Sequence, residues 1–97
     1  MESAVAITEP FIKAYAKLDR GLRSKVERLL ETLGKTALDG DWRLPGAVPI
    51  DVDGFEVSLS EEWIFEYRMI YEGHVVRRLK RIDVNLSQPR TPLDLRI

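Results

Sequence analysis

The residues of this chain that are best suited to chemistry are basic and lie close together. Five of the fifteen Lys and Arg residues fall in EYRMIYEGHVVRRLKRID, residues 66–83. They are Arg68, Arg77, Arg78, Lys80 and Arg81. Clustered cations bind phosphate or carboxylate groups and stabilise negative charge that develops in a transition state. The stretch therefore has two interpretations: a site for an anionic partner, or the solvated face of a small sheet, whose exposed ion pairs contribute about 0–1 kcal/mol each.

Other kinds of site have little support in the sequence. The chain has no cysteine, which excludes disulfides and thiolate metal sites. The acidic residues lack the ligand spacing of a calcium or zinc site, and the six glycines are isolated turn residues rather than a phosphate-binding loop. We therefore expect neither a metal nor a cofactor. His74, the only histidine, falls in a predicted turn, where an incidental role is expected.

Composition indicates one globular domain over residues 1–97, with 44% hydrophobic and 32% charged residues. The net charge of −1 argues against a protein that is basic overall, as most nucleic-acid-binding domains are. An anion site must therefore be local, and no Lys or Arg lies between Arg43 and Arg68. The N-terminus lacks the features of a secretion signal, and no apolar run approaches the ~20 residues of a membrane span. A cytoplasmic location is expected.

The N-terminal half predicts a short strand followed by two helices. The strand is expected at residues 3–7, and Thr8 is placed to cap a first helix that has a glutamate and a proline in its first turn. A second helix is predicted from a stripe of apolar residues at helical spacing, and Gly34 stands where that helix should end. The stripe consists of Leu22, Val26, Leu29, Leu30 and Leu33. The short connection LDRG, residues 18–21, implies an antiparallel helical hairpin.

The C-terminal half predicts strands after a loop over residues 36–54 that contains one short strand. FEVSLS, residues 55–60, and IFEYRMIY, residues 64–71, both alternate between apolar and polar side chains. A hairpin that pairs Phe55 with Met69 would set Glu56 opposite Arg68 on the outer face. Registers shifted by two residues would match the same faces, so the sequence leaves the register open.

The last hairpin also has two interpretations. A two-residue turn in YEGH, residues 71–74, would put Arg81 beside Arg68 on the outer face. The same turn would direct Arg78 and Lys80 toward the helices, which is unfavourable for charged groups, and a three-residue loop would reverse the assignment. After Asp83, residues 84–97 contain two prolines and are predicted to form an extended tail.

This order of elements resembles the RelE/ParE superfamily, the small α+β toxins of type II toxin–antitoxin modules. FIKAYAKLDRGLRSKVERLLETL, residues 11–33, is similar to the first two helices of that family. YRMIY, residues 67–71, resembles its central strand, and LKRID, residues 79–83, resembles the end of its last strand. The resemblance covers residues 4–84 and implies an N-terminal strand and a two-helix hairpin packed on a small antiparallel sheet.

The resemblance also implies a catalytic set. In the RelE branch the concave sheet face cuts messenger RNA on the ribosome, which requires cations near the scissile phosphate and an acid–base pair. By motif match, Arg68 and Arg81 are the predicted phosphate ligands. Lys80 falls where several relatives carry histidine, and Glu56 is the best-placed candidate for a general base.

Departures from the family pattern keep three functions open. The aromatic or histidine acid that many active members place after the closing basic pair is missing, and Asn85 and Ser87 stand in that neighbourhood. The main expectation is a ribosome-dependent mRNA endoribonuclease that inhibits translation. The alternatives are a ParE-type toxin that poisons DNA gyrase by binding, which the missing acid favours, and a silent binding module that keeps only the fold.

Partners follow from the same resemblance. A cognate antitoxin protein is expected, with acidic residues that meet the basic cluster and a helix or strand laid across the helical hairpin or the sheet. The other expected partners are the ribosome with its mRNA or, in the alternative, DNA gyrase, and no membrane partner is expected. The tail is predicted to become ordered when the antitoxin binds.

Overall fold

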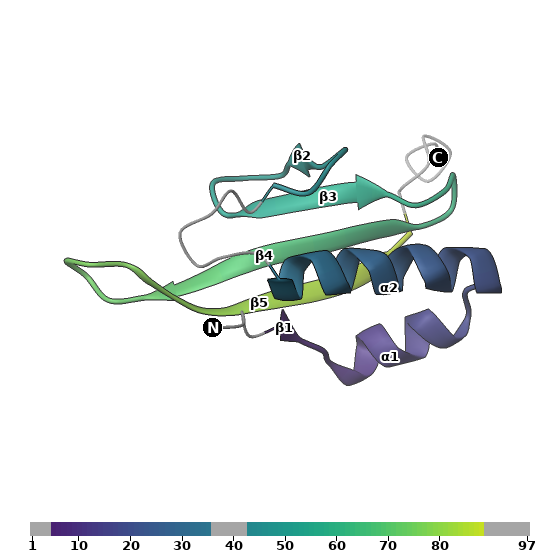
Figure 1. Ribbon diagram of the computed structural model, residues 1–97, viewed down its shortest axis with the longest axis horizontal. Helices are drawn as coiled ribbons and strands as arrows, with labels where there is room; N and C mark the ends of the chain where they lie inside the picture. Colours follow the sequence, from purple (N-terminus) through teal and green to yellow (C-terminus); the bar gives the residue numbers. More distant parts are fainter. Residues whose placement is uncertain (1–4, 36–42, 89–97) are drawn as a thin grey trace, which may run out of the picture.

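The computed structural model describes residues 5–35 and 43–88, and it shows a small α+β fold in which two helices pack on a five-stranded mixed sheet (Figure 1). The strand order across the sheet is β1-β5-β4-β3-β2. The elements are β1 (Val5–Ala6), α1 (Glu9–Ala16), α2 (Arg20–Lys35), β2 (Val48–Pro49), β3 (Gly54–Ser58), β4 (Ile64–Glu72) and β5 (Arg78–Ser87). In the described part of the chain, neither helix has the length and apolar character required to cross a membrane.

Local sequence signals define the starts of both helices. The Phe11 backbone N–H donates to Thr8 Oγ1 at 3.4 Å, so the predicted N-cap of α1 is confirmed. Asp19 caps α2 in the same way, because its Oδ1 accepts from the Leu22 backbone N–H at 2.9 Å. The prediction that Gly34 follows the second helix was wrong, since α2 includes this residue in an ordinary helical conformation.

The sheet is mixed rather than antiparallel, because β1 pairs with β5 in parallel, with Val5 beside Ile82. The expectation of an antiparallel sheet followed from the hairpin-connected strands, and those pairs are indeed antiparallel. A parallel pair needs a long crossover connection, and between β1 and β5 the chain passes through the helical hairpin and three strands. Both helices lie on one face of the sheet (Figure 1), and we call the opposite face the outer face.

The register between β3 and β4 differs from the expected one by two residues. Phe55 lies opposite Tyr67 rather than Met69, and Glu56 lies opposite Glu66 rather than Arg68. The turn explains the shift, because the backbone N–H groups of Leu59 and Ser60 both donate to the Trp63 carbonyl oxygen. The faces are unchanged, since a shift of two residues preserves the alternation of a strand.

The last turn follows neither of the two predicted loops, because it is longer than both. The connecting loop comprises residues 73–77, and the pairing shifts by one residue between Ile70–Arg81 and Tyr71–Leu79. Lys80 is the extra residue of this β-bulge. The bulge lets Leu79 pack against the core beside Tyr71, while Arg78 and Lys80 stay exposed and neither is directed toward the helices.

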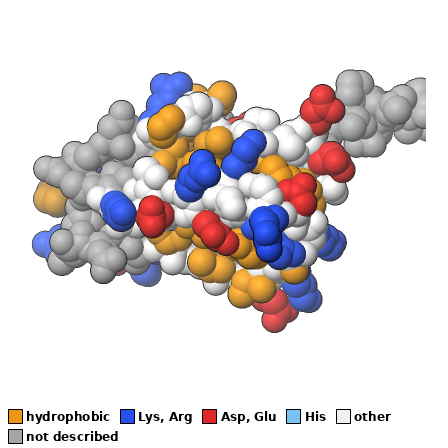
Figure 2. Space-filling view, turned by 45° about the vertical axis from the view of Figure 1, so that its right-hand side comes forward, with side chains coloured by type: hydrophobic (Ala, Val, Ile, Leu, Met, Phe, Trp, Pro, Cys, Tyr) orange, Lys and Arg blue, Asp and Glu red, His pale blue; other side chains and the backbone are white. Residues whose placement is uncertain are grey.

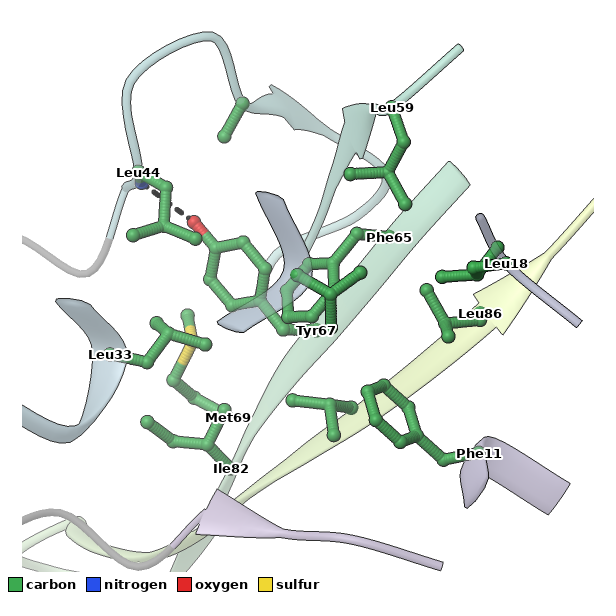
Figure 3. Packing of buried hydrophobic residues seen from close by; sticks show 13 residues of the cluster. Phe11, Leu18, Leu33, Leu44, Leu59, Phe65, Tyr67, Met69, Ile82 and Leu86 are labelled. Atoms are coloured by element: carbon green, nitrogen blue, oxygen red, sulfur yellow. Dashed lines mark hydrogen bonds between the residues drawn. The ribbon is translucent and has the colours of Figure 1, made fainter. Parts of the chain in front are cut away.

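One hydrophobic core joins the helices to the sheet (Figure 3). Phe11 of α1 and Leu33 of α2 meet the inward-facing side chains of β4 and β5. Tyr67 is 1% exposed, and its hydroxyl oxygen accepts a hydrogen bond of 2.8 Å from the Leu44 backbone N–H. This hydrogen bond gives the buried Tyr67 hydroxyl a partner, and it holds the loop before β2 against the core.

The first residues of the predicted tail belong to the sheet. β5 continues through Ser87, and its side chains Val84 and Leu86 are buried. The rest of the tail, residues 89–97, lies outside the described residues.

Candidate functional site

The outer face brings together two of the predicted site residues, Arg68 of β4 and Arg81 of β5. Arg68 lies opposite Asp83, and Arg81 lies opposite Ile70, two pairs further along the same strands. Beside Arg68 the face forms a depression of about 240 Å³. Its lining includes side chains from the β2–β3 loop, β4 and β5: Ile50, Glu66, Arg68, Asp83 and Asn85.

Arg68 is held against the β2–β3 loop by an ion pair whose two side chains are nearly half exposed. Its Nη1 lies 2.7 Å from Asp51 Oδ1, and this hydrogen bond holds the pKa of the Asp51 carboxyl below its usual value. The guanidinium lies over Gly54, where a β-carbon would come within 3.0 Å of both Arg68 Nη2 and Asp51 Oδ1. The residue under the ion pair is therefore best a glycine, which leaves room for both side chains. Through this ion pair, Arg68 connects β4 to the loop that leads into β3.

Arg81 is also held by an aspartate, in this case on its own strand. Its Nε donates to Asp83 Oδ1 at 2.7 Å, and its Nη2 donates to Asp83 Oδ2 at 3.5 Å. Residues two apart on a strand share a face, so the pair forms within the outer face itself. Both predicted phosphate ligands thus have a carboxylate partner at hydrogen-bond distance.

Lys80 and Glu56, the other two predicted site residues, lie apart from these ion pairs. Lys80 is exposed on the bulge, near the far end of the β4–β5 hairpin. Glu56 lies opposite Glu66, and the Glu66 carboxylate accepts a hydrogen bond of 3.1 Å from Asn85 Nδ2. The structure therefore does not set Glu56 opposite Arg68, and the catalytic roles of all four residues remain a prediction.

Acidic groups outnumber basic groups at this part of the outer face. The described lining of the depression has two carboxylates, Glu66 and Asp83, and one guanidinium group, that of Arg68. Beside the lining, Asp51 pairs with Arg68, and Arg81 pairs with Asp83. On the helical side, which Figure 2 shows, basic, acidic and hydrophobic side chains are interspersed rather than separated into patches. Around this depression an RNA phosphate would have to compete with carboxylates for both arginines.

A second group of candidate residues occurs at the end of the β4–β5 hairpin, and the sequence analysis singled out only part of it. Val75 is 95% exposed and Val76 is 67% exposed in the loop 73–77, which we call the hairpin tip. The carboxylates of the described residues all lie more than 4 Å from the charged groups of Arg78 and Lys80. The adjacent valines in a turn were a usable signal, because turns rarely place two apolar β-branched residues together.

Arg77 fixes the tip to the body of the protein. Its guanidinium lies 4.2 Å from the centre of the Tyr71 ring, and its Nη2 lies 2.9 Å from Asp53 Oδ2. Asp53 is itself joined to β4, because its carbonyl oxygen accepts from the Met69 backbone N–H at 3.0 Å. The two contacts of Arg77 hold the base of the tip in one position.

The helical side carries a smaller apolar depression of about 200 Å³. It lies at the junction of β1, α1 and α2, with the exposed side chains Ile7 and Ile12 on its rim. Tyr15 borders it and donates a hydrogen bond to the Glu27 carboxylate, which raises the pKa of the Tyr15 hydroxyl. In the described part of the chain, no group of His, Asp or Glu side chains could hold a metal ion.

Comparison with known proteins adds no relative: no protein-family model, no curated protein and no solved structure matches this chain. The functional argument therefore rests on the residues and their geometry.

Proposed function

We propose that this protein is the toxin of a type II toxin–antitoxin module of the RelE/ParE superfamily, and that it acts by binding its target rather than by cutting RNA. The proposal is supported first by the order of elements. A short strand, a helical hairpin and then antiparallel strands with YRMIY in the central one form the arrangement that the sequence resemblance implies. The ParE-type alternative, in which DNA gyrase is the target, is the branch that fits this mode of action.

The observation that carries the binding mode is the pairing of both central arginines with aspartates. Arg68 and Arg81 each lie 2.7 Å from a carboxylate oxygen, and the surrounding face carries more acids than bases. A nuclease of the RelE type needs cations that are available to a scissile phosphate, and it needs a proton donor nearby. Asn85 cannot supply a proton at neutral pH, and its side chain is bound to Glu66.

The antitoxin remains part of the proposal. The apolar depression beside Ile12 lies next to β1, which is the edge strand of the described sheet, and this combination suits an added helix or strand. Both gyrase and the ribosome work in the cytoplasm, so the proposal includes a cytoplasmic location.

The ribosome-dependent endoribonuclease stays as a second candidate because Arg78 and Lys80 are exposed cations without a carboxylate nearby in the described structure. One experiment separates the two functions. The purified chain is added to a reconstituted bacterial translation system, with primer extension on the mRNA, and in parallel to purified DNA gyrase with plasmid DNA.

The binding toxin predicts intact mRNA together with inhibited supercoiling or trapped, cleaved DNA. Cuts within codons that require ribosomes would contradict the binding mode and leave the toxin proposal standing. No effect in either assay, together with normal bacterial growth when the chain is expressed, would contradict the toxin proposal itself.

A further inference from the structure

The β4–β5 hairpin extends beyond the rest of the described structure and ends in an apolar tip. Figure 1 shows that this hairpin forms one end of the molecule along its longest axis. The extents along the three principal axes are 47, 32 and 25 Å. Val75 and Val76 occupy the tip and are among the most exposed large hydrophobic side chains of the described residues. Exposed valines are common singly, but an adjacent pair at the end of a projecting hairpin is a surface suited to insertion into a partner.

The conformation of the hairpin tip is constrained on both sides, by Gly73 and by Arg77. Gly73 has a φ of +100°, and a β-carbon at this position would lie 2.3 Å from the Val76 carbonyl oxygen. The turn therefore requires a glycine for both its backbone angle and its close packing. On the other side, Arg77 stacks on Tyr71 and pairs with Asp53. A surface that is already ordered loses less entropy when it binds.

Positive charge surrounds the two valines. Arg78 and Lys80 are exposed and lie more than 4 Å from any carboxylate of the described residues, in contrast to Arg68 and Arg81. Between Tyr71 and Arg81 the chain has three Lys or Arg residues and one acidic residue, Glu72. An apolar centre with a charged rim is the usual composition of a protein interface, and a cationic rim fits a partner with carboxylates.

We propose that the hairpin tip, with Arg78 and Lys80 at its base, is the surface that enters the target of this toxin, and that it fits an apolar pocket rimmed by carboxylates on a protein. The inference rests on the proposed function and deepens it. It assigns target binding to the far end of β4 and β5, away from the depression at Arg68. The bulge at Lys80 makes the surface possible, because it keeps both cations exposed while Leu79 stays packed on the core.

The test is growth arrest in bacteria that express the chain from a titratable promoter. Val75→Ser/Val76→Ser removes the apolar centre, and Val48→Ser/Val52→Ser is the matched control, since Val48 and Val52 are also exposed, at 57% and 87%. Arg78→Glu/Lys80→Glu reverses the charged rim, and its control reverses two exposed arginines of α2, Arg20→Glu/Arg28→Glu. Thermal unfolding of each purified variant establishes that it is folded.

We expect both tip variants to need about tenfold more inducer, or more, for half-maximal arrest, because the loss of two central contacts weakens an interface by at least that factor. Both controls should arrest growth as the unmodified chain does. Folded tip variants that arrest growth at the control level would overturn the inference and leave the proposed function intact. A harmless unmodified chain would instead contradict the proposed function.

A nucleic-acid target is distinguished by gel retardation of a DNA duplex. Retardation that is lost in Arg78→Glu/Lys80→Glu and kept in Val75→Ser/Val76→Ser would overturn the assignment to a protein pocket, because contacts to phosphate depend on charge and not on the valines. If the chain does not retard the duplex at concentrations that inhibit DNA gyrase, the result supports the assignment of the tip to a protein pocket.

Discussion

The middle and the tip of the β4–β5 hairpin carry the same kinds of basic side chain and use them differently. At the outer face, Arg68 and Arg81 are each bound to an aspartate, so their charge contributes to the structure of the sheet. At the hairpin tip, Arg77 alone is bound, and Arg78 and Lys80 extend into solvent beside two exposed valines. The comparison teaches that a cluster of cations in sequence predicts an anion site only where the fold leaves the cations without partners.

Deletion of Leu79 should have the largest effect, because it removes the bulge and leaves Lys80 directly before Arg81 on a regular strand. The Lys80 side chain then takes the inward position that Leu79 held beside Tyr71. We expect a loss of about 2 kcal/mol or more in the free energy of unfolding, measured by urea denaturation. Deletion of Lys80 is the control, because it removes only the extra residue and leaves Leu79 at the inward position. A Leu79 deletion as stable as the Lys80 deletion would contradict the assignment of the bulge.

Gly73→Ala should have the next largest effect and should act on the tip alone. The positive φ and the contact with the Val76 carbonyl oxygen predict a loss of about 1–3 kcal/mol in the free energy of unfolding. The variant should also show weaker growth arrest, because the valines are displaced. Gly34→Ala in α2 has open space at the β-carbon and should not destabilise the protein, so equal stability of the two variants would count against the constrained tip.

Gly54→Ala should disturb the outer face by a smaller amount, because the new methyl group meets the ends of two side chains rather than backbone. The expected result is a weakened Arg68–Asp51 pair and a pKa of Asp51 that returns toward its ordinary value. Carboxyl NMR titration measures this change directly. An unchanged Asp51 pKa in the folded variant would show that the pair does not depend on the glycine.

The smallest effect concerns the dependence of stability on pH. Asp51 has a lowered pKa in the folded state because Arg68 donates to its carboxylate, so the unfolded state binds more protons as the pH falls. The stability from this group is present above the unfolded pKa and is lost below about pH 4, as the pH falls through the folded pKa. Asp51→Asn should therefore flatten the acid limb of a Tm-versus-pH curve, and an identical slope would contradict the role of the pair.

The sequence predicted the local parts of this fold well. Thr8 at the start of α1, the leucine stripe of α2 and the alternation in β4 depend on neighbouring residues, and all three are present in the structure. The same alternation put Arg68 on the outer face, where it lies, whereas the sequence left the face of Arg81 open. These features could be predicted because helical and strand periodicity decide which side of an element faces the core.

Features that depend on contacts between distant segments could not be predicted in this way. Asp51 is seventeen residues from Arg68, and no local pattern indicated that the two side chains would pair. The register of β3 was decided by hydrogen bonds in the turn at Ser60, and the bulge at Lys80 was decided by the burial of Leu79. Each of these choices left the hydrophobic alternation of the neighbouring strand intact, so the sequence pattern alone did not distinguish them.

The most direct test of the central claim is growth arrest by the double variant Arg68→Ala/Arg81→Ala, compared with the unmodified chain at equal levels of folded protein. If both arginines serve the structure of the outer face and the target is bound elsewhere, the double variant should still arrest growth. If cells that accumulate the folded double variant grow at the uninduced rate, the outer face is the functional surface and our account is wrong.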